Sequence, residues 1–269
     1  MKRKVTIAAI TIVSVYLVLC AAIYLFQDTL LFPGAARGSG HPDAVANVEI
    51  TTLSTADGID YRVAIGKPSG TPKGVLLHFV GNGEDLRSGV YHAAEFAAYG
   101  MKTLVTEYPG YGESGGSPSF TSIMAAADSS GAEAQRWAAK LKVPLFIVGQ
   151  SLGSFSAVHL VAKGLGDRLL LVSPPTTIAA TGQHHYPWLP VGLLLRHPFD
   201  NLKNAPSVSI PTLVIHGDAD RIVPVEMGKK VAAAITGSKL HIASGSGHNN
   251  LGLGWNGPLG SMIRDHFFR

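Results

Sequence analysis

A serine stands between two glycines where the character of the chain changes abruptly. The apolar run "PLFIV" ends at Val148, "GQSLG" follows, and a helix-like run, "SFSAVHLVAKGLG", comes next. A strand, Gly-x-Ser-x-Gly and a helix in that order are typical of a sharp turn that presents a nucleophile. Gly149 and Gly153 have no side chains to obstruct such a turn. An ordinary glycine turn is the alternative, and we predict that Ser151 is a nucleophile.

A serine hydroxyl attacks only when a base takes its proton, and the base needs an acid that orients it. In chains with this turn the order is serine, acid, histidine. Asp220 follows a strand-like run in "VIHGDADRIVP", and His248 lies in the glycine-rich "ASGSGHNN". Asp218 is the rival acid. We favour Asp220 because the turn has cleared the strand at that position, whereas Asp218 suits a turn cap.

Attack on a carbonyl group also requires donors for the charge that develops on its oxygen. One expected donor is the backbone N–H of Leu152, directly after the serine. The other is expected from the loop "VGNGED", where the backbone N–H of Asn82 is the candidate. Tyr108 and Tyr111 are candidate pocket residues, with surface turn aromatics as the alternative.

Other chemistries have little support in the composition. The single cysteine, Cys20, cannot build a disulfide framework or a thiolate metal site. His184 and His185 are adjacent, so their side chains are expected to point apart, and no carboxylate cluster lies nearby. The formal charge is +4, with three positive charges in the first four residues, which gives no electrostatic support for a nucleic-acid partner. We expect no metal and no organic cofactor.

The elements that must position these residues follow from the apolar pattern. Hydrophobic residues make up 46% of the 269 residues and charged residues 15%, which excludes a disordered chain. Helical spacing between apolar runs predicts a mostly parallel sheet flanked by helices. Asp57-Gly58 predicts a hairpin that adds an antiparallel edge. His78 and His216 are expected as core residues with satisfied hydrogen bonds. The strand-like runs are "VLLHFV", "KTLVTEY", "PLFIVG", "RLLLVS" and "TLVIHG".

The first segment of the chain predicts a membrane anchor. Val5 to Phe26 is 22 uncharged residues, which reach ~33 Å as a helix. The basic stub before it predicts a cytoplasmic N-terminus, with the other residues on the periplasmic, lumenal or extracellular side. A signal peptide that is cleaved from a secreted protein is the alternative. We therefore expect an anchor at 1–27, a linker at 28–47 and one domain at 48–269.

A proline-rich insertion at about 174–206 interrupts the alternation of strands and helices. Long insertions of this kind are usually lids or binding loops, so we expect a short cap. Trp188, Leu189 and Leu193 to Leu195 are candidates to receive an acyl chain or to lie on the membrane. Covering the sheet edge is the alternative for them.

Taken in order, "GQSLG", "HGDADRIVP" and "SGHNN" resemble the α/β-hydrolase superfamily. Three further segments, "FQDTLLFPG", "EYPGYGESGGSPS" and "YPWLPVGLLLRHPFDN", resemble its Bem46-like branch, which includes the α/β-hydrolase-domain-13 and -17 types. The resemblance runs from Phe26 to the C-terminal helix and implies an α/β-hydrolase fold with a Ser-His-Asp triad. One departure is Val80, where the family usually has histidine before Gly-Asn.

The expected function is a serine hydrolase that cleaves a carboxylic ester or thioester of an acyl-lipid or acylated substrate through an acyl-enzyme. A peptidase or amidase remains an alternative within the same chemistry. A catalytically idle scaffold that acts as a binding protein is the alternative of another class, because fold does not determine function. The altered residue at Val80 is its support.

Overall fold

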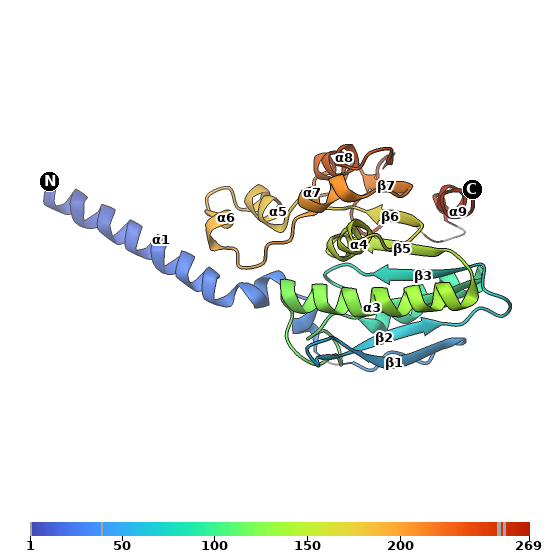
Figure 1. The fold of residues 1–269 in the computed structure, drawn as a ribbon. Coiled ribbons are helices and arrows are strands. Elements are labelled where there is room, and N and C mark those ends of the chain that lie inside the picture. The colour runs from blue at the N-terminus through green and yellow to red at the C-terminus, as the bar shows by residue number, and fades with distance from the viewer. Residues whose placement is uncertain (1, 39, 252–253, 255–256) are drawn as a thin grey trace.

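The structure is a computed structural model that describes residues 2–38, 40–251, 254 and 257–269. The described residues form one eight-stranded sheet in the order β1-β2-β4-β3-β5-β6-β7-β8 (Figure 1). The strands are β1 (Val48–Ser54), β2 (Asp60–Gly66), β3 (Gly74–Phe79), β4 (Met101–Thr106), β5 (Leu145–Gln150), β6 (Arg168–Val172), β7 (Thr212–Gly217) and β8 (Lys239–Ala243).

Helices connect most of the strands. The α-helices are α1 (Lys2–Leu31), α2 (Leu86–Ala98), α3 (Phe120–Leu141), α4 (Gly153–Ala162), α5 (Ile178–His185), α6 (Val191–Leu194), α7 (Asn201–Asn204), α8 (Val225–Ala234) and α9 (Gly260–Phe268). Two 3₁₀ turns, η1 (Ala35–Arg37) and η2 (Ala205–Ser207), complete the set in the described part of the chain.

The sheet confirms the predicted mixture of pairings. β1 and β2 form an antiparallel hairpin around Asp57-Gly58, and β2 pairs antiparallel with β4. Every other described pairing is parallel, from β4 and β3 through to β7 and β8. The sequence pattern did not predict β8, because this edge strand begins with exposed residues and lacks a continuous apolar run. The carboxyl ends of the parallel strands meet at one edge, where the turn after β5 lies.

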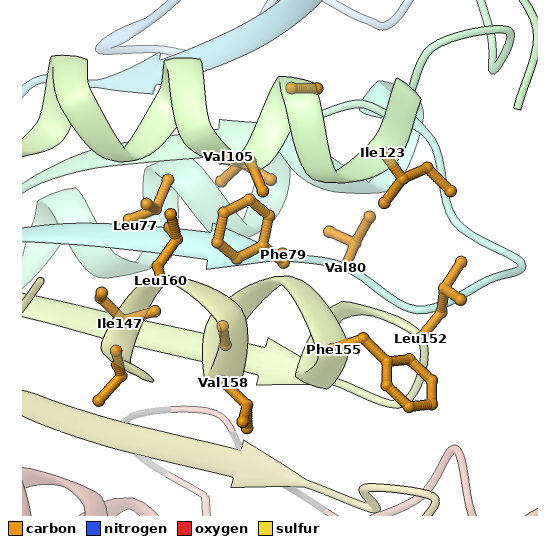
Figure 2. Close-up of a cluster of buried hydrophobic side chains, with 14 of the residues drawn as sticks. Leu77, Phe79, Val80, Val105, Ile123, Ile147, Leu152, Phe155, Val158 and Leu160 are labelled. Carbon is orange, nitrogen blue, oxygen red and sulfur yellow. The ribbon is translucent and has the colours of Figure 1, made fainter. Parts of the chain in front are cut away.

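Two hydrophobic layers cover the sheet. On one face, α3 and α4 pack on the central strands through residues such as Ile123, Phe155 and Leu160 (Figure 2). On the other face, residues of α2 and α9 join a second cluster, in which Phe146 stacks on Phe267 with ring centroids 4.8 Å apart. α3 is continuous through Gly131. A Cβ at this position would lie 2.9 Å from the side chain of Leu160 in α4. The glycine therefore permits the close approach of the two helices.

The N-terminal helix is long and apolar enough to cross a membrane by length and composition, and little of it is buried. It ends at Leu31, so the helix continues into the first four residues of the predicted linker at 28–47. Phe32, directly after the helix, is buried in the domain, where its ring forms edge-on contacts with His197 and Phe199. The start of this segment is thus part of the packed structure.

The insertion between β6 and β7 forms a cap of short helices, α5, α6 and α7, with η2 at its end. An antiparallel bridge between Thr177 and Asp200 closes its base. Asn201 ties this base to the helix that follows the serine turn, because its side-chain amide donates to Ser154 Oγ at 2.8 Å. The cap lies beside the second half of α1 (Figure 1).

Candidate active site

The turn between β5 and α4 holds Ser151 in a strained backbone conformation. Its φ angle is +50°, a region that L-residues with side chains rarely adopt and that costs about 1–3 kcal/mol. Hydrogen bonds hold the turn: Ser151 N donates to Val172 O at 2.8 Å, and Ser154 donates to Ser151 O from its Oγ at 2.6 Å and from its N at 3.0 Å. Strain that the surroundings maintain in this way is typical of a functional residue.

The two flanking glycines are required by close packing. A Cβ on Gly149 would lie 2.7 Å from Ala157 Cβ, and a Cβ on Gly153 would lie 2.1 Å from Phe79 O. Neither position therefore accepts a side chain without movement of the backbone. The packing brings the start of α4 directly behind Ser151, where helix amides favour negative charge.

Asp220 and His248 meet at the same edge of the sheet. His248 Nδ1 lies 2.7 Å from Asp220 Oδ2, and the Asp220 side chain is fully buried. Asp220 Oδ1 accepts hydrogen bonds from the backbone N–H groups of Ile222 and Val223, each at 2.8 Å. The carboxylate is thus fixed on one side by the turn after β7, and its other oxygen faces the imidazole. A proton on Nδ1 leaves Nε2 of His248 as a base.

The surroundings of Asp220 keep it ionised. Burial by itself would raise its pKa, but hydrogen bonds from His216 and His248 and from the N–H of Val223 outweigh burial and hold the pKa well below the usual range. His216 Nε2 lies 3.3 Å from Asp220 Oδ2 and 2.9 Å from Val223 O. His216 therefore contacts the candidate acid from behind. The sequence interpretation as a fully satisfied core histidine was wrong, since its Nδ1 has no partner among the described residues.

Asp218, the rival acid, lies in a different environment. Its Oδ1 accepts a hydrogen bond from Gly245 N at 2.7 Å across the loop. The side chain thus ties two turns together, in keeping with a turn-capping role, and the structure brings Asp220 rather than Asp218 to His248.

Ser151 and His248 line one cavity with a volume of about 740 Å³. Leu152 and Asn82 line it as well, so each residue predicted as nucleophile, base or oxyanion donor contributes to one cavity wall. Within the described part of the chain, no hydrogen bond is found from the backbone N–H of Asn82 or of Leu152. The apolar part of the wall comes from the sheet, α2, the cap and the loop before α9, with Phe96, Val148, Leu170, Val172, Ile178 and Leu251.

The side chain of Asn82 is fully engaged, which leaves its backbone amide as the group that can face a substrate. Asn82 Nδ2 donates to Leu31 O at the end of α1 at 2.6 Å, and Tyr111 Oη donates to Asn82 Oδ1 at 2.6 Å. Arg37 donates to the carbonyl of Gly83 in the same loop. The segment after the N-terminal helix therefore fixes the loop that carries Asn82.

Tyr108 and Tyr111 lie behind the cavity wall, and neither is among the described residues that line it. Both are buried, with ring centroids 5.4 Å apart. Tyr108 Oη donates to Val80 O at 2.6 Å, as Tyr111 does to Asn82. The prediction of pocket-lining tyrosines is thus corrected, because both hydroxyl groups hold the loop before α2. Val80 itself is buried in the core at the position where the family usually has histidine.

Trp188 and Leu189 are also absent from the cavity wall formed by the described residues. Trp188 is 54% exposed on the outside of the cap, while Leu189 is buried inside the cap at 6% exposure. The cap instead contributes Pro175, Ile178 and Thr181 to the cavity. These three residues come soon after the end of β6, and ligands in such folds bind beyond the carboxyl ends of the strands. Their position after a strand end is therefore the sequence signal that could have identified them.

His78 is a polar residue of the cavity that the sequence interpretation treated as satisfied. It is 3% exposed, lines the cavity, and has no hydrogen-bond partner for either ring nitrogen among the described residues. Burial lowers its pKa to about 3, and the neighbouring His92 adds to this effect. His78 is therefore a neutral imidazole. Its ring packs edge-on against His92 and Phe96.

Among the described residues no group of three or more His, Cys, Asp or Glu side chains could hold a metal ion. The rings of His184 and His185, expected to point apart, contact each other edge-on with centroids 5.2 Å apart. His185 Nε2 lies 2.8 Å from the carbonyl oxygen of Ile222, so this ring joins the cap to the loop that follows Asp220.

The mostly parallel sheet, the strained serine after β5 and the Asp-His pair beside it define a class of protein. The chain has the α/β-hydrolase fold. Residues 195–268 match the family described as TAP-like protein. An esterase from Pyrococcus furiosus has the same fold, with a TM-score of 0.63 over 86% of this chain and 96% of that one, at 15% identity.

Curated relatives include proteins with and without a known activity. An uncharacterized protein of Mycobacterium tuberculosis is 33% identical over 177 residues, which are 63% of this chain and 61% of the relative. The lysophosphatidylserine lipase ABHD12 of Danio rerio is 30% identical over 58% of this chain and 46% of the lipase. An uncharacterized membrane protein of Saccharomyces cerevisiae is 28% identical over 81% of this chain and 78% of the yeast protein. The chain thus covers about three-fifths of its mycobacterial relative and under half of the lipase.

Proposed function

We propose that the chain is a membrane-anchored serine hydrolase that cleaves a carboxylic ester or thioester of an acyl substrate. The observation that carries the proposal is the bond between His248 Nδ1 and the buried carboxylate of Asp220, beside the cavity that Ser151 lines. The names of the esterase and lipase with which the chain compares support an ester substrate. The apolar part of the cavity wall suits an acyl chain.

The reaction follows from these positions. His248 Nε2 takes the proton of Ser151 Oγ, and Oγ attacks the carbonyl carbon of the substrate. The backbone N–H groups of Asn82 and Leu152 hold the resulting oxyanion. His248 then protonates the leaving group, and an acyl-Ser151 intermediate forms. A water molecule, deprotonated by His248, hydrolyses this intermediate and restores the serine. Asp220 keeps the imidazole in the required tautomer throughout.

We also propose that α1 is retained as a single membrane span. A helix of its length and composition, and the relative from yeast that is a membrane protein, support an anchor. The side chains of Gln27 and Asp28 bond to the cap, which favours a helix that stays attached over a cleaved signal peptide. The basic residues before Val5 favour a cytoplasmic N-terminus, with the hydrolase domain on the other side.

A fluorophosphonate probe on the purified full-length chain tests the proposal, because such probes react with activated serines. We expect labelling that is lost in Ser151→Ala. A panel of p-nitrophenyl esters of increasing chain length, with thioesters and peptide amides beside them, then separates esterase from peptidase activity. A chain that unfolds cooperatively on heating but takes no label at Ser151 would instead be a binding scaffold.

A further inference from the structure

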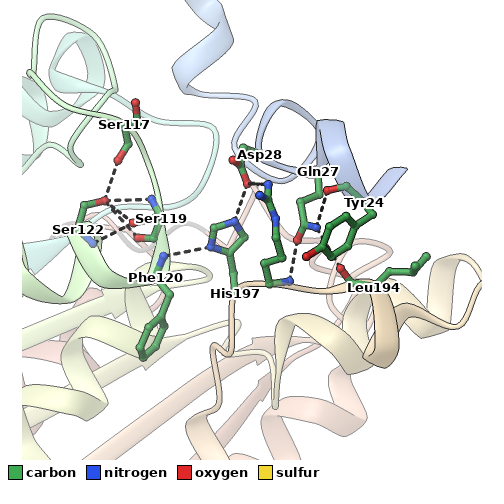
Figure 3. A network of polar contacts seen from close by, with 10 residues as sticks. Tyr24, Gln27, Asp28, Ser117, Ser119, Phe120, Ser122, Leu194 and His197 are labelled. Carbon is green, nitrogen blue, oxygen red and sulfur yellow. Dashed lines mark hydrogen bonds and ion pairs between the residues drawn. The ribbon is translucent and has the colours of Figure 1, made fainter. Parts of the chain in front are cut away.

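The cap and the N-terminal helix are joined by polar contacts at two levels. At the C-terminal end of α1, Gln27 Nε2 donates to Leu194 O at 3.0 Å, and Arg196 N donates to Gln27 Oε1 at 2.7 Å (Figure 3). Farther toward the N-terminus, Tyr16 Oη donates to Trp188 O at 2.9 Å. The cap therefore lies along α1 from Asp28 back to Tyr16.

This contact reaches deep into the apolar part of the helix. Tyr16 precedes the helix end at Leu31 by 15 residues, or ~22 Å along the axis. It stands near the middle of the uncharged stretch from Val5 to Phe26. If α1 crosses a bilayer, the residues of the cap beside Tyr16 cannot remain in bulk water at any ordinary tilt of the helix. The cap must then contact lipid together with α1.

The chemistry of the cap fits such a position. From residue 174 to residue 195 the chain has no Asp, Glu, Lys or Arg. Its exposed side chains include Tyr186 at 53%, Trp188 at 54% and Leu193 at 86%. Tyrosine and tryptophan are enriched where membrane meets water, and leucine on the apolar side of that level. The cap lies beside α1 (Figure 1), and the exposed large hydrophobic side chains of α1 are mostly aliphatic.

The first charged residues after the two uncharged stretches contact each other. Arg196 Nη2 lies 2.9 Å from Asp28 Oδ1, and His197 Nε2 donates to the same oxygen at 2.6 Å (Figure 3). Asp28 is the first acidic residue of the chain, and Arg196 is the first charged residue after the uncharged part of the cap. A common level therefore divides the apolar from the charged part of both segments.

The backbone contacts agree with a site from which water is excluded. The carbonyl groups of Trp188 and Leu194 accept hydrogen bonds from Tyr16 and Gln27, and the N–H of Arg196 donates to Gln27. In lipid, backbone polar groups need partners inside the protein, because no water is there to bond them. Side chains of α1 supply these partners.

We infer that the outer side of the cap, with Tyr186, Trp188 and Leu193, is a second membrane-binding surface, inserted into the phospholipid bilayer that α1 spans. The inference depends on α1 crossing a bilayer and not on the catalytic proposal. One consequence does rest on the proposed function: Pro33, two residues after the end of α1, and Ile178 of the cap both line the cavity, so an acyl substrate would reach Ser151 from the membrane surface.

Tryptophan fluorescence tests the inference on the full-length chain in phosphatidylcholine vesicles. Trp137→Phe with Trp255→Phe leaves Trp188 as the single tryptophan, and the matched control keeps Trp137 of α3 as the single one. Phosphatidylcholine brominated along its acyl chains should quench Trp188 strongly and Trp137 little. If both are quenched alike, or Trp188 is quenched mainly by acrylamide from the water, the inference is overturned.

Leu193→Asp in the single-Trp188 chain sharpens the test. Leu193 is highly exposed, so the change should leave folding intact, and a charge at this position should remove most of the quenching by brominated lipid. Leu240→Asp, at an exposed position of the edge strand β8, is the control and should leave the quenching unchanged. Unchanged quenching in Leu193→Asp would also contradict insertion of this surface.

If the double tryptophan variant unfolds, Trp188→Phe in the native chain should remove the lipid-quenched fluorescence. Persistence of that fluorescence would count against the inference. None of these readouts requires catalysis, so they fail or succeed independently of fluorophosphonate labelling.

Discussion

The turn that carries Ser151 and the joint between α1 and the cap are both held by hydrogen bonds, but over different distances in sequence. At the turn, Ser154 bonds to Ser151 three residues away, and the glycines that permit the geometry flank the serine. At the joint, Gln27 bonds to Leu194 and Asp28 to His197, across more than 160 residues. Local geometry thus presents the nucleophile, whereas long-range contacts place the cavity relative to the membrane segment. The two regions should respond differently to substitution.

The largest effect is expected at the turn. Ser151→Ala removes the nucleophile, and in an enzyme of this kind such a change lowers kcat by about 10⁶-fold. Ser156→Ala is the matched control in α4, because its buried hydroxyl has no partner among the described residues. Ester hydrolysis by both variants checks the expectation. Loss of activity in Ser156→Ala as well would indicate that α4, and not one hydroxyl, controls turnover.

Asp220→Asn should follow with a loss of about 10⁴-fold in kcat, because an amide does not hold the imidazole in the required tautomer. Asp218→Asn should leave kcat within a small factor of the native value, since Asp218 contacts Gly245 N and not His248. Rates at saturating ester concentration measure both. Equal losses of kcat in the two variants would mean that Asp220 is not the acid that orients His248.

Ser151 and Asp220 could both be predicted from the sequence alone. Two sequence features were enough to predict which side chains the fold brings to one edge of the sheet: the turn "GQSLG" after a strand, and the order of serine, acid and histidine along the chain. The parallel sheet and the hairpin at Asp57-Gly58 followed from apolar patterns in the same way.

Other features were beyond the reach of the sequence because they depend on contacts between distant segments. The hydroxyl groups of Tyr108 and Tyr111 bond to a loop about thirty residues earlier, which no local pattern encodes. The same holds for His216 behind Asp220, and for the contact of Tyr16 with the cap. Tertiary packing determines where these side chains lie, whereas the periodicity of apolar residues indicates only which face of a helix or strand is buried.

A smaller effect, on stability, is expected at the joint. Asp28→Ala leaves the buried imidazole of His197 without its acceptor, which should cost about 1–3 kcal/mol of unfolding free energy. The control is Asp265→Ala, which removes an exposed ion pair with Arg269 that contributes about 0–1 kcal/mol. Thermal unfolding in detergent, with proteolysis of the cap, measures both. Equal stability of the two variants would mean that the joint contributes little.

The stability of the native chain should also depend on Asp220 as pH falls. Its folded-state pKa is lowered, so its contribution is complete above the ordinary aspartate pKa of about 3.9 and is lost as pH falls toward the folded-state pKa. The stability difference between the native chain and Asp220→Asn should therefore narrow below about pH 4. Denaturant unfolding across this range measures it. A difference that stays constant at all pH values would contradict the assigned shift.

The smallest effect is expected where the two regions meet, at the loop that carries Asn82. Tyr111→Phe keeps the buried ring but removes the hydrogen bond to Asn82 Oδ1, and a loss near 1 kcal/mol corresponds to about five- to tenfold in kcat. KM should change less, because the amide acts on the oxyanion. Tyr91→Phe, whose exposed hydroxyl lies 3.3 Å from Asp43, is the control and should be neutral. A change in KM alone would assign Tyr111 to substrate binding.

We propose that Ser151 and His248 act as one catalytic unit, and a double-mutant cycle measures the coupling between them. Ester hydrolysis is compared for the native chain, Ser151→Ala, His248→Ala and the double variant. We expect the double variant to be about as slow as either single variant, because removing one member already abolishes the shared step. Losses that multiply in the double variant would show that the two residues act independently and not as a nucleophile with its base.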